Sequence, residues 1–399
     1  MLTCSIDSSI PQLLQVPPTT TPILCLIYQP VTLISDMSVF TTYPGKALWV
    51  LSAIVITLLK LPLLGFYFVL KRPDPNWTVR QAFMNSLMRT FLYHSAVVKA
   101  KTPLKLDPGS EGERFIQMRP VEDIHLRGVL DDKRIRPITI GGTWYPSAPP
   151  KDYGGKIILH FHGGGYAIGE GRAADAAYAG KTLTENTAPY ALFVQYRLAS
   201  NDSGRFPAAV QDALSSYTHL LSQGYPASKI VISGDSAGGH VALSLLRYLS
   251  TENVSLAPPR AFLLWSPAID LEVAKNSSTV DRSEFYATDY LDGNFSSWGA
   301  TRFSEGLDMT DSTIRAYVVQ LGHEFRAASP LWICVGSLEI LGPEGTRFGR
   351  ELREKGSVVE IHIIPRAPHD VLFVGNILGF EREAVEAAKL ASRFVENAA

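Results

Sequence analysis

Residues 234–238 read Gly-Asp-Ser-Ala-Gly and place one serine where it could act as a nucleophile. The apolar run before them (230–232) is typical of a strand, and the pattern at 241–246 is typical of a helix. A sharp strand-to-helix turn presents a serine hydroxyl at the end of a sheet. Flanking glycines are needed there because a side chain would collide with the neighbouring backbone. By itself such a motif is about as often structural as catalytic. The expected nucleophile is Ser236, and its motif neighbours are Gly234, Asp235 and Gly238.

A second glycine-rich motif lies upstream at residues 162–165, which read His-Gly-Gly-Gly. It follows the strand-like run 156–161 and precedes the serine motif by one strand–helix–strand unit. Successive glycines let backbone N–H groups approach a developing oxyanion without a Cβ atom in the way. The alternative is that these glycines only make the loop flexible. The serine motif that follows in the sequence argues against this alternative. The expected oxyanion-hole donors are Gly164, Gly165 and Ala237, with His162 and Gly163 as motif residues.

The other members of a serine triad are expected downstream, first an acid and then a histidine. His369 follows the strand-like run 358–364, which is a suitable place for the base. Glu339 stands just past the preceding strand-like run and is the preferred acid. Asp370 is an alternative, but it adjoins His369 in sequence and its side chain is expected to point elsewhere. Glu344 is a second alternative for the acid, but it lies in the first turn of a helical pattern, where a carboxylate complements the helix dipole.

With these motifs the chain resembles the hormone-sensitive-lipase-like family of serine esterases, within the α/β-hydrolase superfamily. The resemblance extends from about residue 104 to the C-terminus, and fungal members with a hydrophobic N-terminal helix are most similar. It implies a serine carboxylic-ester hydrolase acting on an apolar ester, with a helical cap and no metal or organic cofactor. The usual acid of the family is aspartate, so Glu339 is a departure. Further stretches that carry the resemblance are 196–199, 206–209, Asp212, 265–270 and 289–291.

Alternating strand and helix patterns predict an α/β fold with a mostly parallel, doubly wound sheet. Residues 271–328 interrupt the alternation and are expected to form a cap insertion in a catalytic domain spanning 104–399. The aromatic residues of this insertion either line an apolar pocket or form the cap's own core. A helix at 78–93, begun by a Thr78–Gln81 capping box, is expected to join the cap from the region 71–103. The expected strands are 114–119, 136–145, 156–161, 190–196, 229–233, 261–265, 331–336 and 358–365.

The composition is that of an ordinary globular enzyme. The chain has 399 residues, of which 46% are hydrophobic and 19% charged, and its net charge of −1 gives no electrostatic case for nucleic acid. Cys334 is the one cysteine of the three that lies in the hydrolase part, so no disulfide is expected within that part. His160 and His162 form a His-x-His pair, but without an evident third ligand they predict no metal site.

A polar N-terminal segment (1–46) precedes the apolar segment 47–70, which is long enough to cross a bilayer. Lys60 near its middle costs about 2.5–3.5 kcal/mol on insertion scales, which the surrounding apolar residues offset. We expect a single transmembrane helix rather than an interfacial helix or one buried under the cap. Lys71 and Arg72 after it favour a cytosolic catalytic domain, in the endoplasmic reticulum membrane. Five glycosylation sequons argue the other way: Asn76, Asn201, Asn253, Asn276 and Asn294.

Two other functions fit the same motifs. An acyl-enzyme in a dry pocket could pass its acyl group to an alcohol or amine, or close a lactone, in a biosynthetic pathway. The second alternative function is that of a non-catalytic receptor on the same fold, and the presence of His369 argues against it. The sequence does not identify the acyl or alcohol group of the ester substrate or the oligomeric state.

Overall fold

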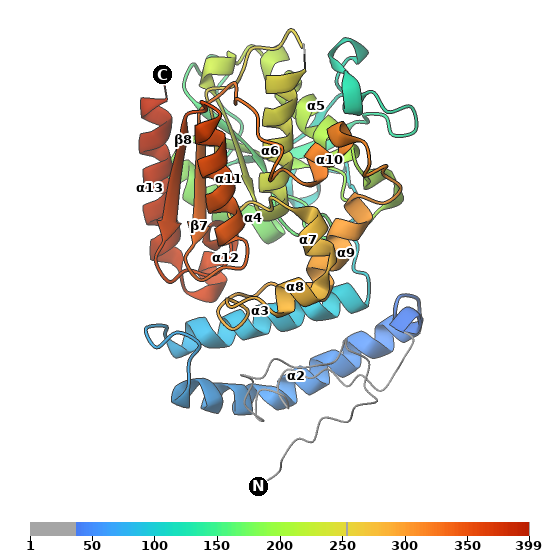
Figure 1. The fold of residues 1–399 in the computed structure, drawn as a ribbon, viewed down its shortest axis with the longest axis vertical. Helices are drawn as coiled ribbons and strands as arrows, with labels where there is room; N and C mark the ends of the chain where they lie inside the picture. Colours follow the sequence, from blue (N-terminus) through green and yellow to red (C-terminus); the bar gives the residue numbers. More distant parts are fainter. Residues whose placement is uncertain (1–36, 253, 399) are drawn as a thin grey trace.

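The computed structural model describes residues 37–252 and 254–398 (Figure 1). The predictions for residues 1–36 and for the sequon at Asn253 lie outside the described residues. An eight-stranded sheet has the order β1-β2-β4-β3-β5-β6-β7-β8. β2 is antiparallel to β1 and β4, and all later pairs are parallel. The predicted α/β fold is therefore confirmed, and each predicted strand is present: β1 (Phe115–Met118), β2 (Ile140–Tyr145), β3 (Ile157–Phe161), β4 (Tyr190–Gln195), β5 (Ile230–Asp235), β6 (Ala261–Trp265), β7 (Leu331–Gly336) and β8 (Val359–Ile364).

Helices cover both faces of the sheet, so the parallel strands are apolar on both sides (Figure 1). Along β3, Ile157 and Leu159 face one core, and Ile158 between them faces the other. Helices α5, α6 and α11 contribute to the first core, and α4, α12 and α13 to the second. The bounds of these helices are α4 (Ala173–Asn186), α5 (Ala208–Ser222), α6 (Ser236–Thr251), α11 (Gly342–Glu354), α12 (Val371–Leu378) and α13 (Glu381–Asn397).

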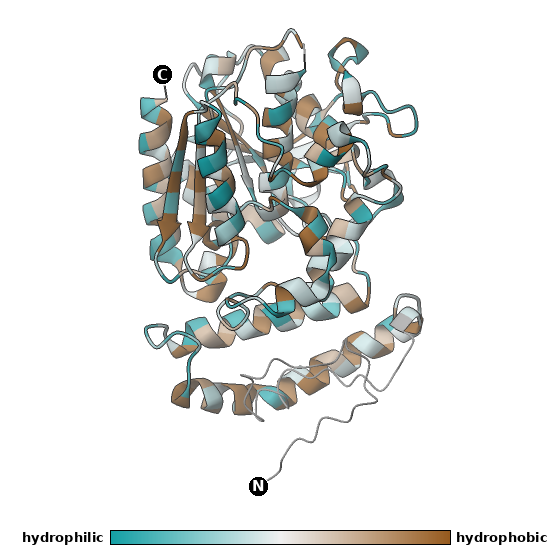
Figure 2. Ribbon diagram, viewed as in Figure 1, coloured by the Kyte–Doolittle hydropathy of each residue, from teal (hydrophilic) through white to brown (hydrophobic). Residues whose placement is uncertain are grey.

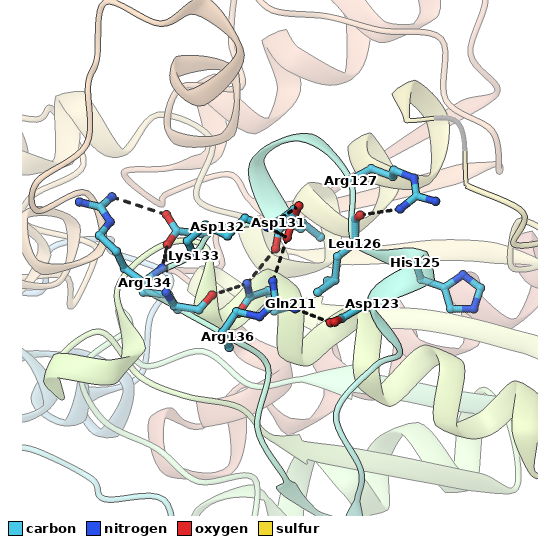
Figure 3. Close-up of polar contacts among 12 residues, drawn as sticks. Asp123, His125, Leu126, Arg127, Asp131, Asp132, Lys133, Arg134, Arg136 and Gln211 are labelled. Carbon is cyan, nitrogen blue, oxygen red and sulfur yellow. Dashed lines mark hydrogen bonds and ion pairs between the residues drawn. The ribbon is translucent and has the colours of Figure 1, made fainter.

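The segment predicted as a strand at 136–145 begins only at Ile140, because side chains hold the residues before it in a loop. Gln211 on α5 donates from Nε2 to the carbonyl oxygens of Leu130 and Ile135. Arg197 donates to the carbonyl of Arg136 at 2.9 Å. Figure 3 shows this loop, with its exposed charged residues paired among themselves. Its carbonyls are therefore satisfied by side chains rather than by a strand ladder.

A cap of short helices and α3 (Val79–Val97) lies over one end of the sheet (Figure 1). The predicted capping box is present: Thr78 accepts from the Gln81 N–H, and the Gln81 side chain accepts from the Thr78 N–H. Arg89 of α3 donates to the carbonyls of Tyr286 and Asp289, which ties α3 to the cap. The other cap helices are α7 (Leu271–Lys275), α8 (Ser277–Asp281), α9 (Gly293–Phe303) and α10 (Ser312–Val318).

Helix α2 (Gly45–Leu70) packs along α3 on the side away from the sheet (Figure 1). Leu64 and Phe68 are buried, and the Trp49 indole N–H donates to His94 Nδ1 at 3.2 Å. Most of its surface is nevertheless apolar and exposed (Figure 2). Within the described residues it is the one helix long and apolar enough to cross a membrane. Its most exposed large side chains are Leu48, Leu51, Leu59, Leu63, Phe66 and Leu70.

Candidate active site

The turn between β5 and α6 presents Ser236 with a left-handed backbone, φ +52°. Non-glycine residues seldom adopt this conformation, and it persists only where the surrounding structure holds it. Two glycines make room for the turn. A Cβ on Gly234 would lie 2.3 Å from the Gly238 carbonyl oxygen, and one on Gly238 would lie 2.0 Å from the Phe161 carbonyl oxygen. The serine is thereby held at the wall of a cavity.

His369 follows β8 and lies against this serine. Its Nε2 is 2.9 Å from Ser236 Oγ, which is hydrogen-bonding distance. The ring is 1% exposed, and burial lowers the pKa of His369 to about 3. The imidazole is therefore neutral at pH 7, and a neutral ring nitrogen accepts the hydroxyl proton of a serine.

Glu339 lies just past β7 and is fully buried near His369. Its Oε2 is 3.8 Å from His369 Nδ1, beyond hydrogen-bonding distance. The same oxygen accepts a 2.6 Å hydrogen bond from Ser266 Oγ, while Glu339 Oε1 and His369 Nδ1 have no partner. Burial raises the pKa of Glu339, and the charge of Asp289 raises it further. Hydrogen bonds between catalytic groups are often long before substrate binds, so this spacing leaves Glu339 in reach of the imidazole.

The two alternative acids occupy different places. The Asp370 carboxyl group accepts from the Phe373 N–H and lies within hydrogen-bonding reach of the Asp235 carboxyl group. Glu344 lines the cavity, and burial raises its pKa to about 7 with a smaller effect from Asp270.

Ser266 is a site residue for which the sequence predicted no role. It directly follows β6, beside the strand that leads to Glu339, and its φ is +43°. Its hydroxyl donates to Glu339 and accepts from the Asp370 N–H at 2.9 Å. A polar residue directly after a buried strand was the available signal.

The glycine-rich loop after β3 approaches Ser236 closely. A Cβ on Gly163 would lie 3.1 Å from the Ser236 Cβ and 2.3 Å from an Asp235 carboxylate oxygen. The Gly163 N–H donates to that Asp235 oxygen, Oδ2, at 2.7 Å. Gly164 and Gly165 take positive φ values of +97° and +60° and line the cavity together with Ala237. These three residues therefore border the space in front of Ser236.

The same loop packs directly on the cap helix α9. A Cβ on Gly299 would lie 1.8 Å from the Gly165 carbonyl oxygen, and one on Gly165 would lie 2.7 Å from Phe295. His162 is fully buried beneath the loop, stacked on Tyr196 with ring centroids 4.7 Å apart. No group of residues suited to a metal ion occurs among the described residues.

The cavity that contains Ser236 has a volume of about 970 Å³ and is bounded by α3, the cap, the glycine-rich loop and α12. This size accommodates a small organic ligand. Both interpretations of the cap aromatics hold in part. Phe285, Tyr290 and Phe295 line the cavity, and Tyr290 and Phe295 also pack in a hydrophobic core, as do Trp298 and Phe303.

Comparison with known proteins agrees with this architecture. The profile of a family described as having an alpha/beta hydrolase fold matches residues 158–373, more than half of the chain. The ethyl acetate hydrolase of Pseudomonas putida is 29% identical over 58% of this chain and 71% of its own length. An acetyl-hydrolase of Streptomyces hygroscopicus is 28% identical over 63% of this chain and 80% of its own length. The crystal structure of an esterase from the bacterial hormone-sensitive lipase family superposes with a TM-score of 0.54 at 21% identity, covering 84% of this chain and 98% of that one.

The chain therefore belongs to the α/β-hydrolase family. The predicted resemblance to hormone-sensitive-lipase-like esterases is confirmed at this level. The greater similarity to fungal members stays a prediction.

Proposed function

We propose that this protein is a serine hydrolase of carboxylic esters, with Ser236 as nucleophile, His369 as base and Glu339 as the acid that supports the base. The observation that carries the proposal is the 2.9 Å contact between Ser236 Oγ and His369 Nε2 at the wall of the cavity. The esterases and acetyl-hydrolases among the relatives support the same reaction.

In this mechanism His369 Nε2 takes the Ser236 proton while Oγ attacks the ester carbonyl carbon. The N–H groups of Gly164, Gly165 and Ala237 stabilise the oxyanion of the tetrahedral intermediate. The intermediate collapses, and the alcohol leaves with the proton from the imidazolium. Water then attacks the acyl-enzyme, with His369 again as base. Glu339 stabilises the imidazolium and holds Nδ1–H toward itself.

The proposed substrate is an apolar ester. Its support is the apolar lining of the cavity, to which α3 contributes Met88 and Leu92, and α12 contributes Phe373 and Ile377. A chain-length panel of esters would define the acyl group. Assays with water and an alcohol in competition would separate hydrolysis from acyl transfer.

Ser236→Ala tests the proposal directly. Alanine fits the turn, so the protein should fold, as circular dichroism would check, while ester hydrolysis and labelling by a fluorophosphonate probe are abolished. Full-strength labelling of a folded Ser236→Ala protein would show that another residue is the nucleophile.

We also propose that α2 attaches the protein to a membrane as a single span, in the endoplasmic reticulum with the catalytic domain in the cytosol. The exposed apolar surface of α2 supports attachment. Lys71 and Arg72 after the helix support the orientation. Extraction of full-length protein by alkaline carbonate would contradict a span. A mobility shift on deglycosylation would contradict the orientation.

A further inference from the structure

We propose that Asp235 and Asp370 form a buried carboxyl pair sharing one proton, and that this proton positions the glycine-rich loop and His369 around Ser236. Asp235 directly precedes Ser236, and Asp370 directly follows His369. The pair therefore consists of positioning residues, which act through the residues beside them. The inference rests on the proposed function, because its tests measure ester hydrolysis.

The two carboxyl groups meet beneath the site. Asp235 is fully buried, Asp370 is 4% exposed, and their carboxyl groups lie within hydrogen-bonding reach of each other. Two ionised carboxylates have no hydrogen to share, so a hydrogen bond between them requires that one be protonated. Burial, the leading cause, raises the pKa of both carboxyl groups.

The neighbouring hydrogen bonds decide which residue holds the proton. The Trp265 N–H donates to Ser233 Oγ at 3.1 Å, and the buried Ser233 hydroxyl has one hydrogen-bond acceptor among the described residues, His160 Nδ1 at 3.0 Å. Burial lowers the pKa of His160 to about 3, so this neutral ring carries its hydrogen on Nε2. His160 Nε2 then donates to Asp235 Oδ1 at 2.8 Å.

Asp235 is thus an acceptor at both oxygens, Oδ1 from His160 and Oδ2 from the Gly163 N–H. These two hydrogen bonds stabilise the ionised form of Asp235, whereas the Asp370 carboxyl accepts one, from the Phe373 N–H, so Asp370 is the donor of the pair. The proton therefore resides on Asp370 and points at an ionised Asp235, whose other bonds hold the glycine-rich loop.

Asp370 connects this pair to the rest of the site. It has a left-handed backbone with φ +48°, and its N–H donates to Ser266 Oγ, which in turn donates to Glu339. Its Oδ1 accepts from the Phe373 N–H at the start of α12. One side chain thereby links the nucleophile turn, the base loop and the acid.

Loss of the shared proton would place two negative charges in contact inside the protein, which is strongly unfavourable. The groups with which the pair interacts supply no positive charge at neutral pH. These groups are Asp175, Tyr196 and His160 beside Asp235, and Tyr290, Glu339 and Cys334 beside Asp370, with neutral His369 adjoining it. We therefore expect activity to fall at alkaline pH as the pair deprotonates.

Asp370→Asn is the decisive variant, because its amide donates permanently to Asp235 and its oxygen can still accept from Phe373. Its kcat at pH 7 should be higher than that of Asp235→Asn, and the alkaline fall in kcat should move to higher pH or vanish. Asp235→Asn should instead lower kcat by about 10- to 100-fold with little change in KM, because its amide hydrogens face donors. Asp281→Asn, at a half-buried carboxyl with a raised pKa outside this pair, should leave the alkaline fall in place.

The wild-type protein supplies an independent readout if the variants do not fold. Its infrared spectrum should contain a protonated-carboxyl band that disappears with the same midpoint as the alkaline loss of fluorophosphonate labelling. An alkaline fall that is unchanged in folded Asp370→Asn, or equal activity of the two asparagine variants, would overturn the pair. Absence of a band that titrates with labelling would also overturn it. Loss of labelling at every pH would instead count against the proposed function.

Discussion

Ser266 and His369 both lie near the same carboxylate oxygen of Glu339, Oε2. In this structure Oε2 accepts a hydrogen bond from Ser266 and none from His369. A small rotation that brings Glu339 to the imidazole would complete the triad. In Glu339→Gln the amide keeps the shape but favours the wrong imidazole tautomer. We expect kcat to fall by about 10²–10⁴, in line with the equivalent change in another serine hydrolase. Steady-state kinetics on a small ester would measure this loss.

Glu344→Gln is the comparison, since Glu344 is a half-buried carboxyl of the same region and its substitution should have a far smaller effect on kcat. If Glu344→Gln lowered kcat strongly and Glu339→Gln lowered it only slightly, Glu344 would be the triad acid. The assignment of the nucleophile would not change.

The sequence was informative about residues that belong to local motifs, because Ser236 and its glycines are fixed by a single turn. Ser266 could not be predicted, because its role depends on the ends of two neighbouring strands and on a side-chain rotamer. The contact between Asp235 and Asp370 joins residues 135 positions apart in the chain, so no local pattern contains it.

At the scale of elements, the central strands β3, β5, β6 and β7 were predictable because buried parallel strands are mostly continuous apolar runs. The start of β2 was not, because residues before Ile140 are held by Gln211 and Arg197 through their carbonyl groups. Side-chain hydrogen bonds of this kind override local strand preference.

The Arg197–Asp212 pair is the buried centre of this arrangement. Arg197 is 4% exposed and Asp212 is fully buried, with a 2.7 Å contact between Nη2 and Oδ1. Asp212→Ala leaves the guanidinium unpaired, so the free energy of unfolding should fall by about 3–5 kcal/mol in a denaturant titration. Asp131→Ala removes an exposed partner in the nearby loop (Figure 3) and should change stability far less. Equal effects would mean that burial does not determine the strength of these pairs.

For the whole molecule, α2 is separable from the chemistry, whereas α3 is not. The cavity has no lining residue from α2, but α3 supplies several, including Leu92 and Ser95. Trp77, between the two helices, donates its indole N–H to the Arg366 carbonyl and anchors the start of α3.

Removal of residues 1–72 should therefore give a more soluble protein that keeps much of its activity on small esters. Sedimentation after lysis and an esterase assay would measure both properties. Removal of residues 1–97 is the control, and it should abolish activity because the cavity wall is lost. Loss of activity in the shorter truncation would show that α2 supports the site.

The contact between Gly165 and Gly299 restricts how this enzyme can be recombined with its relatives. Because a Cβ at position 299 would reach within 1.8 Å of the Gly165 carbonyl oxygen, α9 fits only when it carries glycine there. A chimera that borrows a cap to change substrate preference must therefore bring glycine at this position, or its glycine-rich loop will be displaced. The cap and the loop thus form one matched unit, and shuffling experiments should exchange them together.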